Sequence, residues 1–129
     1  MLKMITCIKK LPELSLADFY SHWHSPHAAL IRKHADVLGI RHYVQNAPYG
    51  DGSAQKALEF GRSAPSFGFD GCAELWWDDL ESHLSARKTC AGKKALQEII
   101  EDEKRFVDLE SSLLWYCSER PILQTGTAF

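Results

Sequence analysis

The sequence lacks the segments that would place the protein in a membrane or on nucleic acid. No apolar run approaches the roughly 20 residues that a membrane-spanning helix needs, and residues 1–4 lack the basic region and the apolar stretch of a secretion signal. The 15 basic residues nearly balance the 17 acidic ones, and no stretch gathers Lys and Arg into the stripe that binds a phosphate backbone. We therefore expect a cytoplasmic protein with neither a membrane nor a nucleic acid as partner.

Cysteine is scarce and scattered. No Cys-x-x-Cys pair is present, so the commonest sequence patterns for zinc binding and for redox cycling are missing, and we interpret the four cysteines as reduced, mostly buried thiols. What the chain does contain is typical of a globular protein, with 45% hydrophobic and 25% charged residues. A length of 129 residues suits a single domain, residues 1–129.

The first half of the chain predicts a strand, a long helix and a second strand. Residues 2–9 are apolar on both alternating faces, which is typical of a strand covered on both sides. Ser15 with Asp18 three positions on predicts a helix start. At helical spacing, one face that should pack on a sheet collects Leu16, Phe19, Trp23, His27, Leu30, His34 and Val37.

Proline and glycine interrupt this region at several points. Pro26 lies within the helical stripe, so either the helix kinks there or a new helix begins with Ser25 as its cap. Gly39 ends the helical segment, and residues 40–45 alternate as a strand. The six proline and glycine residues between residues 46 and 70 predict an extended loop with at most one helical turn around 54–60. That loop either covers a pocket or is a variable insertion.

The second half repeats the pattern of strand, helix and strand. Residues 71–77 predict the third strand, and Asp78 and Asp79 cap a short helix. Residues 95–107 predict an amphipathic helix, and residues 113–117 predict a fourth strand that is apolar on both faces. Outside the apolar stripe of the helix lie the charged residues Lys93, Lys94, Glu101, Asp102 and Lys104.

The order of these elements predicts an α+β fold. It is the ferredoxin-like βαββαβ arrangement, in which helices cover one face of a four-stranded antiparallel sheet. The other face would stay bare and apolar, which soluble proteins rarely tolerate. We therefore expect a homodimer that packs sheet on sheet.

Three blocks of the sequence resemble the EthD family. They are Phe-Tyr-Ser-His-Trp-His-Ser-Pro-His-Ala-Ala-Leu at 19–30, Gly-Ile-Arg-His-Tyr-Val-Gln at 39–45, and Phe-Asp-Gly-Cys-Ala-Glu-Leu-Trp at 69–76. The resemblance implies a dimeric α+β barrel with an apolar pocket between helices and sheet, and chemistry without metal or organic cofactor. Similar members include a muconolactone methylisomerase and fungal enzymes that dehydrate or cyclise polyketide aromatics. Their histidine and tyrosine correspond by motif to His27 and Tyr43, whereas Ala29 stands where the family often has proline.

His27 and Tyr43 are the candidate catalytic residues. A neutral imidazole among apolar side chains can take or give a proton near neutral pH, although a core histidine bonded to a backbone carbonyl fits the same pattern. Tyr43 can stabilise charge on an enol or phenol oxygen, or simply fill the core. Candidates for substrate contact are Phe19, Trp23, His24, Leu30, His34, Glu74 and Trp76.

Two of the remaining side-chain patterns leave alternatives open. His22, His24 and His27 suggest a metal site, but no carboxylate or cysteine joins them at ligand spacing, so we expect none. Glu74 would have a raised pKa if it were buried. If it instead lay in water near the end of its strand, it would be an ordinary carboxylate. The alternation of side chains along a strand does not say which face of the sheet holds the pocket.

The leading hypothesis is a lyase, isomerase or cyclase that needs no cofactor. It acts on a small aromatic, lactone or polyketide-like molecule in xenobiotic catabolism, through acid–base chemistry of His27 and Tyr43. One alternative is a non-catalytic binding or accessory protein of a degradation operon that carries a small hydrophobic or aromatic ligand. Another is an oxidoreductase of the cofactor-independent monooxygenase type, whose substrate must itself form a carbanion.

Overall fold

A four-stranded antiparallel sheet forms the centre of the computed structural model, which describes residues 1–126. Its strands are β1 (Leu2–Ile8), β2 (His42–Asn46), β3 (Gly71–Trp77) and β4 (Leu113–Ser118). They lie in the order β2-β3-β1-β4, with Met4 opposite both Leu75 and Tyr116. Strand order and direction confirm the predicted ferredoxin-like α+β fold.

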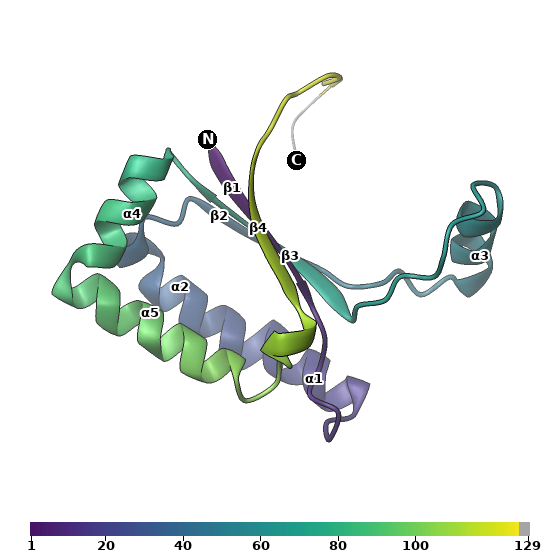
Figure 1. Cartoon of the computed structure of the whole chain (residues 1–129), viewed down its shortest axis with the longest axis horizontal. Coiled ribbons are helices and arrows are strands. Elements are labelled where there is room, and N and C mark those ends of the chain that lie inside the picture. Colours follow the sequence, from purple (N-terminus) through teal and green to yellow (C-terminus); the bar gives the residue numbers. More distant parts are fainter. Residues whose placement is uncertain (127–129) are drawn as a thin grey trace.

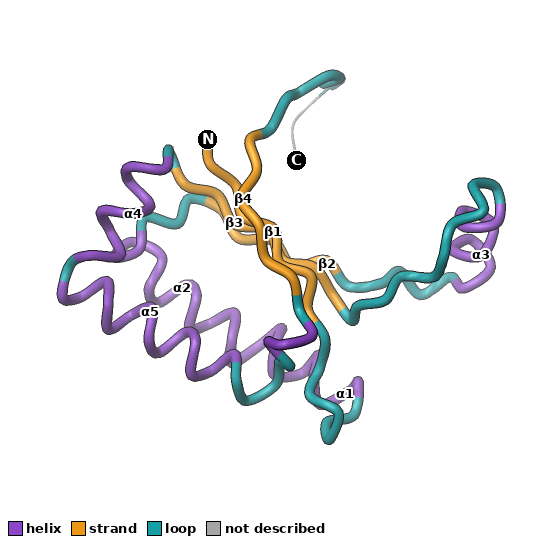
Figure 2. Tube along the Cα trace, in the orientation of Figure 1, coloured by secondary structure: helices purple, strands orange, loops and turns teal. Residues whose placement is uncertain are grey.

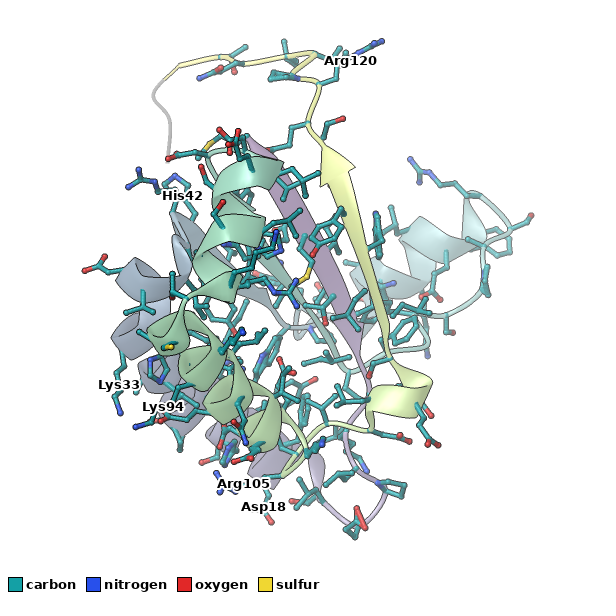
Figure 3. The ribbon with its side chains drawn as sticks, turned by 60° about the vertical axis from the view of Figure 1, so that its left-hand side comes forward. Asp18, Lys33, His42, Lys94, Arg105 and Arg120 are labelled. Atoms are coloured by element: carbon teal, nitrogen blue, oxygen red, sulfur yellow. The ribbon has the colours of Figure 1, made fainter. Side chains whose placement is uncertain are left out.

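Helices cover one face of this sheet (Figures 1 and 2). The N-terminal helical segment comprises α1 (Leu16–His22), a π-helical turn (Trp23–His27) and α2 (Ala28–Leu38), and the C-terminal one comprises α4 (Leu80–Lys88) and α5 (Cys90–Glu103). A short 3₁₀ turn, Leu109–Ser111, leads into β4. Charged side chains such as Asp18, Lys33 and Lys94 point outward from these helices (Figure 3). The helices are therefore amphipathic, as predicted.

The N-terminal helix begins where the sequence predicts. The Ser15 hydroxyl accepts a hydrogen bond from the Asp18 amide at 3.1 Å. It ends at Gly39, whose φ of 70° is in the left-handed region that favours glycine. Ile40 still donates its amide to Ala35, and for this reason β2 begins at His42 and not at residue 40.

Pro26 is accommodated within a widened helical turn. Proline has no N–H for the residue four positions earlier, and the chain responds with the π-helical turn and not with a new helix capped by Ser25. The extra residue in this turn shifts the buried face by about one position. Beyond it, Ile31 and Leu38 are buried, whereas Val37, expected in the stripe, is 41% exposed. Leu16 is also largely exposed, so the predicted stripe is wrong at both ends.

The segment between β2 and β3 contains more regular structure than predicted. A nine-residue helix, α3 (Gly52–Phe60), replaces the single expected turn. The Asp51 carboxylate caps it by accepting hydrogen bonds from the amides of Ser53 and Ala54. No residue of α3 is buried, and Figure 1 shows this helix projecting away from the sheet.

The C-terminal helical segment also differs in its bounds. The Thr89 hydroxyl accepts a hydrogen bond from the Gly92 amide and starts α5 at Cys90, five residues before the predicted start. The helix ends at Glu103, and the apolar Phe106 and Val107 are buried beyond it. The predicted helix therefore ran past its real end, because these two apolar residues fit the helical spacing and belong to the core but not to the helix.

The two faces of the sheet have different surroundings. On β3, Ala73, Leu75 and Trp77 are buried beneath the helices, whereas Cys72, Glu74 and Trp76 point to the other face. No element of residues 1–126 covers that second face (Figure 1). We call it the open face, and the side chains that alternation assigns to it on the other three strands include Lys3, Ile5, Val44, Leu113 and Trp115. Within residues 1–126, every helix is too short or too polar to cross a membrane.

Candidate functional site

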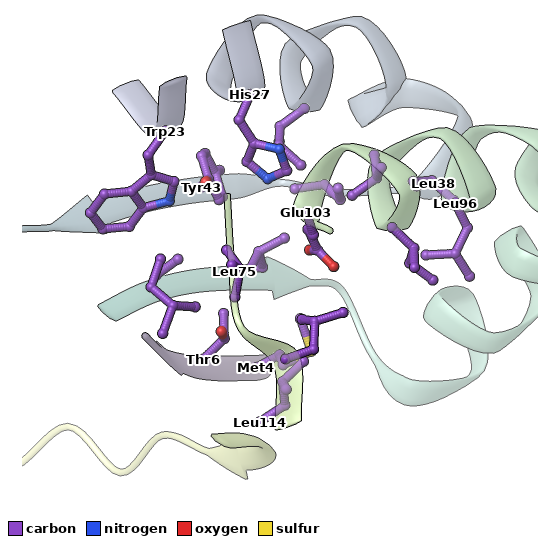
Figure 4. A pocket seen from close by; sticks show the side chains of 18 of the residues that line it. Met4, Thr6, Trp23, His27, Leu38, Tyr43, Leu75, Leu96, Glu103 and Leu114 are labelled. Carbon is purple, nitrogen blue, oxygen red and sulfur yellow. The ribbon is translucent and has the colours of Figure 1, made fainter. Parts of the chain in front are cut away.

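A cavity of about 190 Å³ lies between the helices and the covered face of the sheet (Figure 4). Apolar side chains from β1, β3, α2 and α5 make up most of its wall. The polar lining residues are Thr6, His27, Tyr43, His83, Arg87, Glu103 and Tyr116. An apolar cavity of roughly 150 Å³ admits benzene. The volume therefore suits a ligand built on a single ring.

His27 is placed in this cavity by the π-helical turn. Its ring is directed into the cavity (Figure 4), packs edge-on against Phe106 at 4.9 Å between centroids, and is 4% exposed. Its Nδ1 lies 2.8 Å from Asp102 Oδ2. A carboxylate only accepts hydrogen bonds, so Nδ1 carries the proton and Nε2 keeps its lone pair. Burial lowers the pKa of His27 more than Asp102 raises it, so the imidazole is neutral and available as a base at neutral pH.

Asp102 is held ionised beside this histidine. It accepts hydrogen bonds from His22 Nε2 at 3.0 Å and from the Arg105 guanidinium at 3.1 Å, in addition to the bond from His27. Burial by itself would raise the pKa of Asp102, but these hydrogen bonds outweigh burial and hold the pKa below its usual value. The carboxylate can therefore orient His27 and stabilise the imidazolium that forms when Nε2 takes a proton.

Glu103 brings a second titratable group into the cavity. Figure 4 shows its side chain pointing toward the space below His27. Burial, and to a smaller extent the neighbouring charge of Asp102, raise the pKa of Glu103 to about 7. Near neutral pH this carboxyl group therefore exists in both protonation states, which suits a group that passes protons.

Tyr43 lies on β2 and lines the same cavity. Its oxygen accepts a hydrogen bond from Gln45 Nε2 at 2.9 Å, and Gln45 is itself held by the carbonyl of Trp23 at 2.8 Å. Burial raises the pKa of Tyr43 against the opposing effect of Gln45 and Trp23, so the phenol keeps its proton at neutral pH. The structure thus brings His27 and Tyr43, which are 16 positions apart, into one cavity.

The other predicted contact residues are spread over four environments: the cavity wall, the core, the N-terminal helical segment outside the cavity lining, and the open face. Trp23 lines the cavity, and Phe19 lies behind it in the core. Three residues of the N-terminal helical segment lie outside the cavity lining. They are Leu30, His24, which bonds to Gln45 at 2.7 Å, and His34, which bonds to Glu98 at 2.6 Å.

Glu74 and Trp76 lie on the open face of the sheet, away from the cavity. Glu74 forms an ion pair with Lys3, whose ammonium group also lies 4.6 Å from the centre of the Trp76 ring. Lys3 and Asn46 lower the pKa of Glu74 against the opposing effect of its partial burial. Of the two alternatives left open for Glu74, the structure shows neither a buried glutamate with a raised pKa nor a free solvated carboxylate, but an ion-paired one. Residues 46–70 contribute nothing to the cavity lining, so the segment does not cover this pocket within the protomer.

Comparison with known proteins identifies the family. The model of the EthD domain matches residues 11–110. The chain belongs to the EthD family. This agrees with the resemblance of the three sequence blocks.

Solved structures extend the comparison. An EthD family protein from Bacillus halodurans is 24% identical, with 93% of this chain and 99% of that chain covered and a TM-score of 0.62. A dimeric protein of unknown function and ferredoxin-like fold from Bacteroides fragilis is 11% identical, with 92% and 95% covered and a TM-score of 0.57. SnoaB, a cofactor-independent oxygenase from Streptomyces nogalater, is 10% identical, with 96% and 97% covered and a TM-score of 0.53. These similarities show a shared fold. A search of curated proteins found no match.

Sequence reasoning missed both acidic residues of this EthD-family site. Asp102 was expected outside the apolar stripe because it lies in the charged run Glu-Asp-Glu-Lys, although it follows the buried Ala95 and Ile99 at seven and three positions on one helix face. Glu103 had a detectable signal, since it follows Leu96 and Ile99 at seven and four positions, which is the spacing of one helix face. Within residues 1–126, no three His, Cys, Asp or Glu side chains are arranged to hold a metal ion.

Proposed function

We propose that this EthD-family protein is a proton-transfer enzyme, an isomerase, lyase or cyclase, that uses its own side chains and no cofactor. Its substrate is a small aromatic, lactone or polyketide-like molecule. The observation that carries the proposal is the His27 imidazole, fixed through Nδ1 to Asp102, with its ring directed into an apolar cavity. This is the arrangement of an oriented general base.

The proposed reaction begins at a carbon next to a carbonyl group. His27 Nε2 removes a proton, the C–H electron pair forms a C=C bond as the C=O π pair moves to oxygen, and the Tyr43 hydroxyl donates a hydrogen bond to the enolate oxygen that forms. The resulting imidazolium is paired with Asp102. Return of the proton to a different carbon completes an isomerisation.

Glu103 extends the same chemistry to eliminations. A carboxyl group with a pKa of about 7 is partly protonated at neutral pH and can deliver a proton to a leaving hydroxyl group while His27 keeps the proton from carbon. The products are then an unsaturated ring and water, which corresponds to a dehydrating lyase or cyclase. The neutral His27 thus accepts a proton from the substrate, and the protonated Glu103 donates one to it.

The test uses a panel of small carbonyl compounds that includes α-angelica lactone, a five-membered β,γ-unsaturated lactone. Incubation in D₂O, followed by NMR, reports both isomerisation and deuterium incorporation above the uncatalysed rate. We expect His27→Gln to lower the rate at least about a hundredfold. His34→Gln is the matched control, because His34 lies in the same helical segment outside the cavity. Full activity of the His27 variant would overturn the mechanism.

Asp102 is proposed as a positioning residue, and the same assay tests it. Asp102→Asn removes the charge that raises the pKa of His27. We expect a lower rate and an acid limb of the pH–rate profile that moves to lower pH, since an unpaired imidazole loses its proton more readily. If no compound of the panel exchanges protons although aromatic rings bind in the cavity, the accessory-protein alternative is favoured.

We also propose that two copies pair through the open face. Its apolar and aromatic side chains include Trp115, which is 46% exposed, and Val44, which is 42% exposed. Sheet-on-sheet packing would remove this surface from water and complete a dimeric α+β barrel. The fold neighbour from Bacteroides fragilis is described as dimeric, which supports the proposal.

Cofactor-independent oxygenation is the second candidate function. SnoaB, a cofactor-independent oxygenase, has the same fold, and the proposed base would generate the carbanion that such a reaction requires. Oxygen consumption with single-ring phenolic substrates distinguishes the two reactions. Proton transfer proceeds equally well without oxygen, whereas oxygenation stops.

A further inference from the structure

A second polar cluster lies in the cavity wall, around Tyr116 of β4 and two residues of α4. The Tyr116 hydroxyl lies 2.8 Å from His83 Nε2 and 3.3 Å from the Arg87 guanidinium. All three residues line the cavity. His83 packs against Trp77 with 4.0 Å between ring centroids, which fixes the position of the cluster on the sheet.

The direction of the hydrogen bonds follows from Arg87. A guanidinium group only donates, and Arg87 lies 3.4 Å from His83 Nε2 as well as near the Tyr116 oxygen, so both atoms accept from it. Because Nε2 is an acceptor, the Tyr116 hydroxyl directs its own proton to His83 Nε2. The proton of the neutral His83 ring then lies on Nδ1, which has no partner among residues 1–126. Burial and the charge of Arg87 both lower the pKa of His83, so the cluster carries one positive charge, that of Arg87.

This positive charge has no acidic partner in the part of the chain that the structure describes. Among the ion pairs that residues 1–126 form, none involves Arg87, whereas Arg41 and Arg105 each pair with an aspartate. Arg87 is partly buried at the wall of an apolar cavity. An unpaired guanidinium in such a place favours an anionic group of the ligand, because water screens the attraction less there.

The cluster and the proposed base lie toward opposite ends of the cavity. His83 packs on Trp77 at the end of β3, and Trp23, one turn before His27, lies over Gly71 at the start of the same strand. A ligand anchored at Arg87 therefore extends along the strand toward His27.

We propose that the cavity binds a ring compound that bears a carboxylate, with the carboxylate on the Arg87 guanidinium and the ring directed toward His27. The planar guanidinium matches the two oxygens of a carboxylate. One guanidinium neutralises one such charge, and the remaining wall suits the apolar ring. The inference rests on the proposed function of the same cavity and narrows its substrate class to cyclic or aromatic carboxylic acids.

The test compares phenylacetate with phenylacetamide, which has the same ring and size without the charge, by NMR titration of the full chain. We expect the wild type to bind phenylacetate about tenfold more tightly, and Arg87→Met to lose this preference while it still binds the amide. Arg87→Lys keeps the charge without the planar fork, so part of the preference should remain. Arg32→Met is the control, because it makes the same change in net charge at an exposed position of α2.

Equal affinity of the wild type for the two compounds would overturn the proposal, as would failure of phenylacetate to bind or a preference that survives in Arg87→Met. Proton exchange is measured separately with the uncharged lactone. A catalytically inert protein that still selects phenylacetate through Arg87 would refute the proposed function but keep this site. An active protein that does not prefer phenylacetate would keep the proposed function and refute this site.

Discussion

Replacing Glu103 by glutamine should stabilise the protein at alkaline pH and leave its stability nearly unchanged at acidic pH. Burial raises the pKa of Glu103 to about 7 from an ordinary value of 4.5. The folded state therefore holds a proton that the unfolded chain has already released over the intervening pH range. Because the folded state binds more protons there, the free energy of unfolding falls as the pH rises through this window.

The size of the effect follows from the difference between the two pKa values. Each unit of pKa corresponds to about 1.4 kcal/mol, so the ionised carboxylate costs the folded state about 3 kcal/mol at about pH 8.5. Glutamine has nearly the same shape and never ionises. Glu103→Gln should therefore raise the free energy of unfolding by about 2 to 3 kcal/mol at about pH 8.5 and by close to zero at about pH 4.5.

Urea denaturation at several pH values and one fixed protein concentration measures this difference. Titrations shared by both proteins cancel when the variant is compared with the wild type. Glu101→Gln is the matched control, because Glu101 is exposed on the same helix, and its effect should not depend on pH in this way. A stability difference for Glu103→Gln that is constant over the range, or that grows toward acidic pH, would refute the reasoning.

Two further predictions concern packing and assembly. Gly71→Ala should destabilise the fold by about 1 to 3 kcal/mol in urea denaturation, because an added Cβ would lie 2.6 Å from an indole ring. Gly68→Ala, where a Cβ meets nothing within 4 Å, should have little effect. Trp115→Asp should convert a homodimer into a monomer in native mass spectrometry or sedimentation velocity, because it places a charge on the open face.

The assembly prediction has its own control. Leu84 is 39% exposed on α4, on the opposite side of the sheet from the open face. Leu84→Asp should leave the protein dimeric. A wild type that is monomeric, or a Trp115→Asp variant that stays dimeric, would contradict pairing through the open face.

Much of the fold could be read from the sequence because it follows from local periodicity. Alternation identified β3 with its bounds, Ser15 and Gly39 correctly marked the ends of a helical segment, and the order of elements was sufficient for the sheet topology. The sequence blocks around His27 and Tyr43 correctly indicated the EthD family. These properties depend on residues that are close together in the chain.

Tertiary packing decided what lies around His27. Period-two alternation places Glu74 and Trp76 on one side of β3 but does not say which side the helices cover. The partner of His27 is Asp102, 75 residues away, and helical spacing places this aspartate on the buried face of its helix without saying which group it meets there. The pKa of Glu103 depends in the same way on burial by distant segments. The sequence by itself therefore determined the elements, their order and the candidate base, whereas only the tertiary structure decided which acidic groups surround that base, because desolvation and hydrogen bonding depend on contacts between segments far apart in the chain.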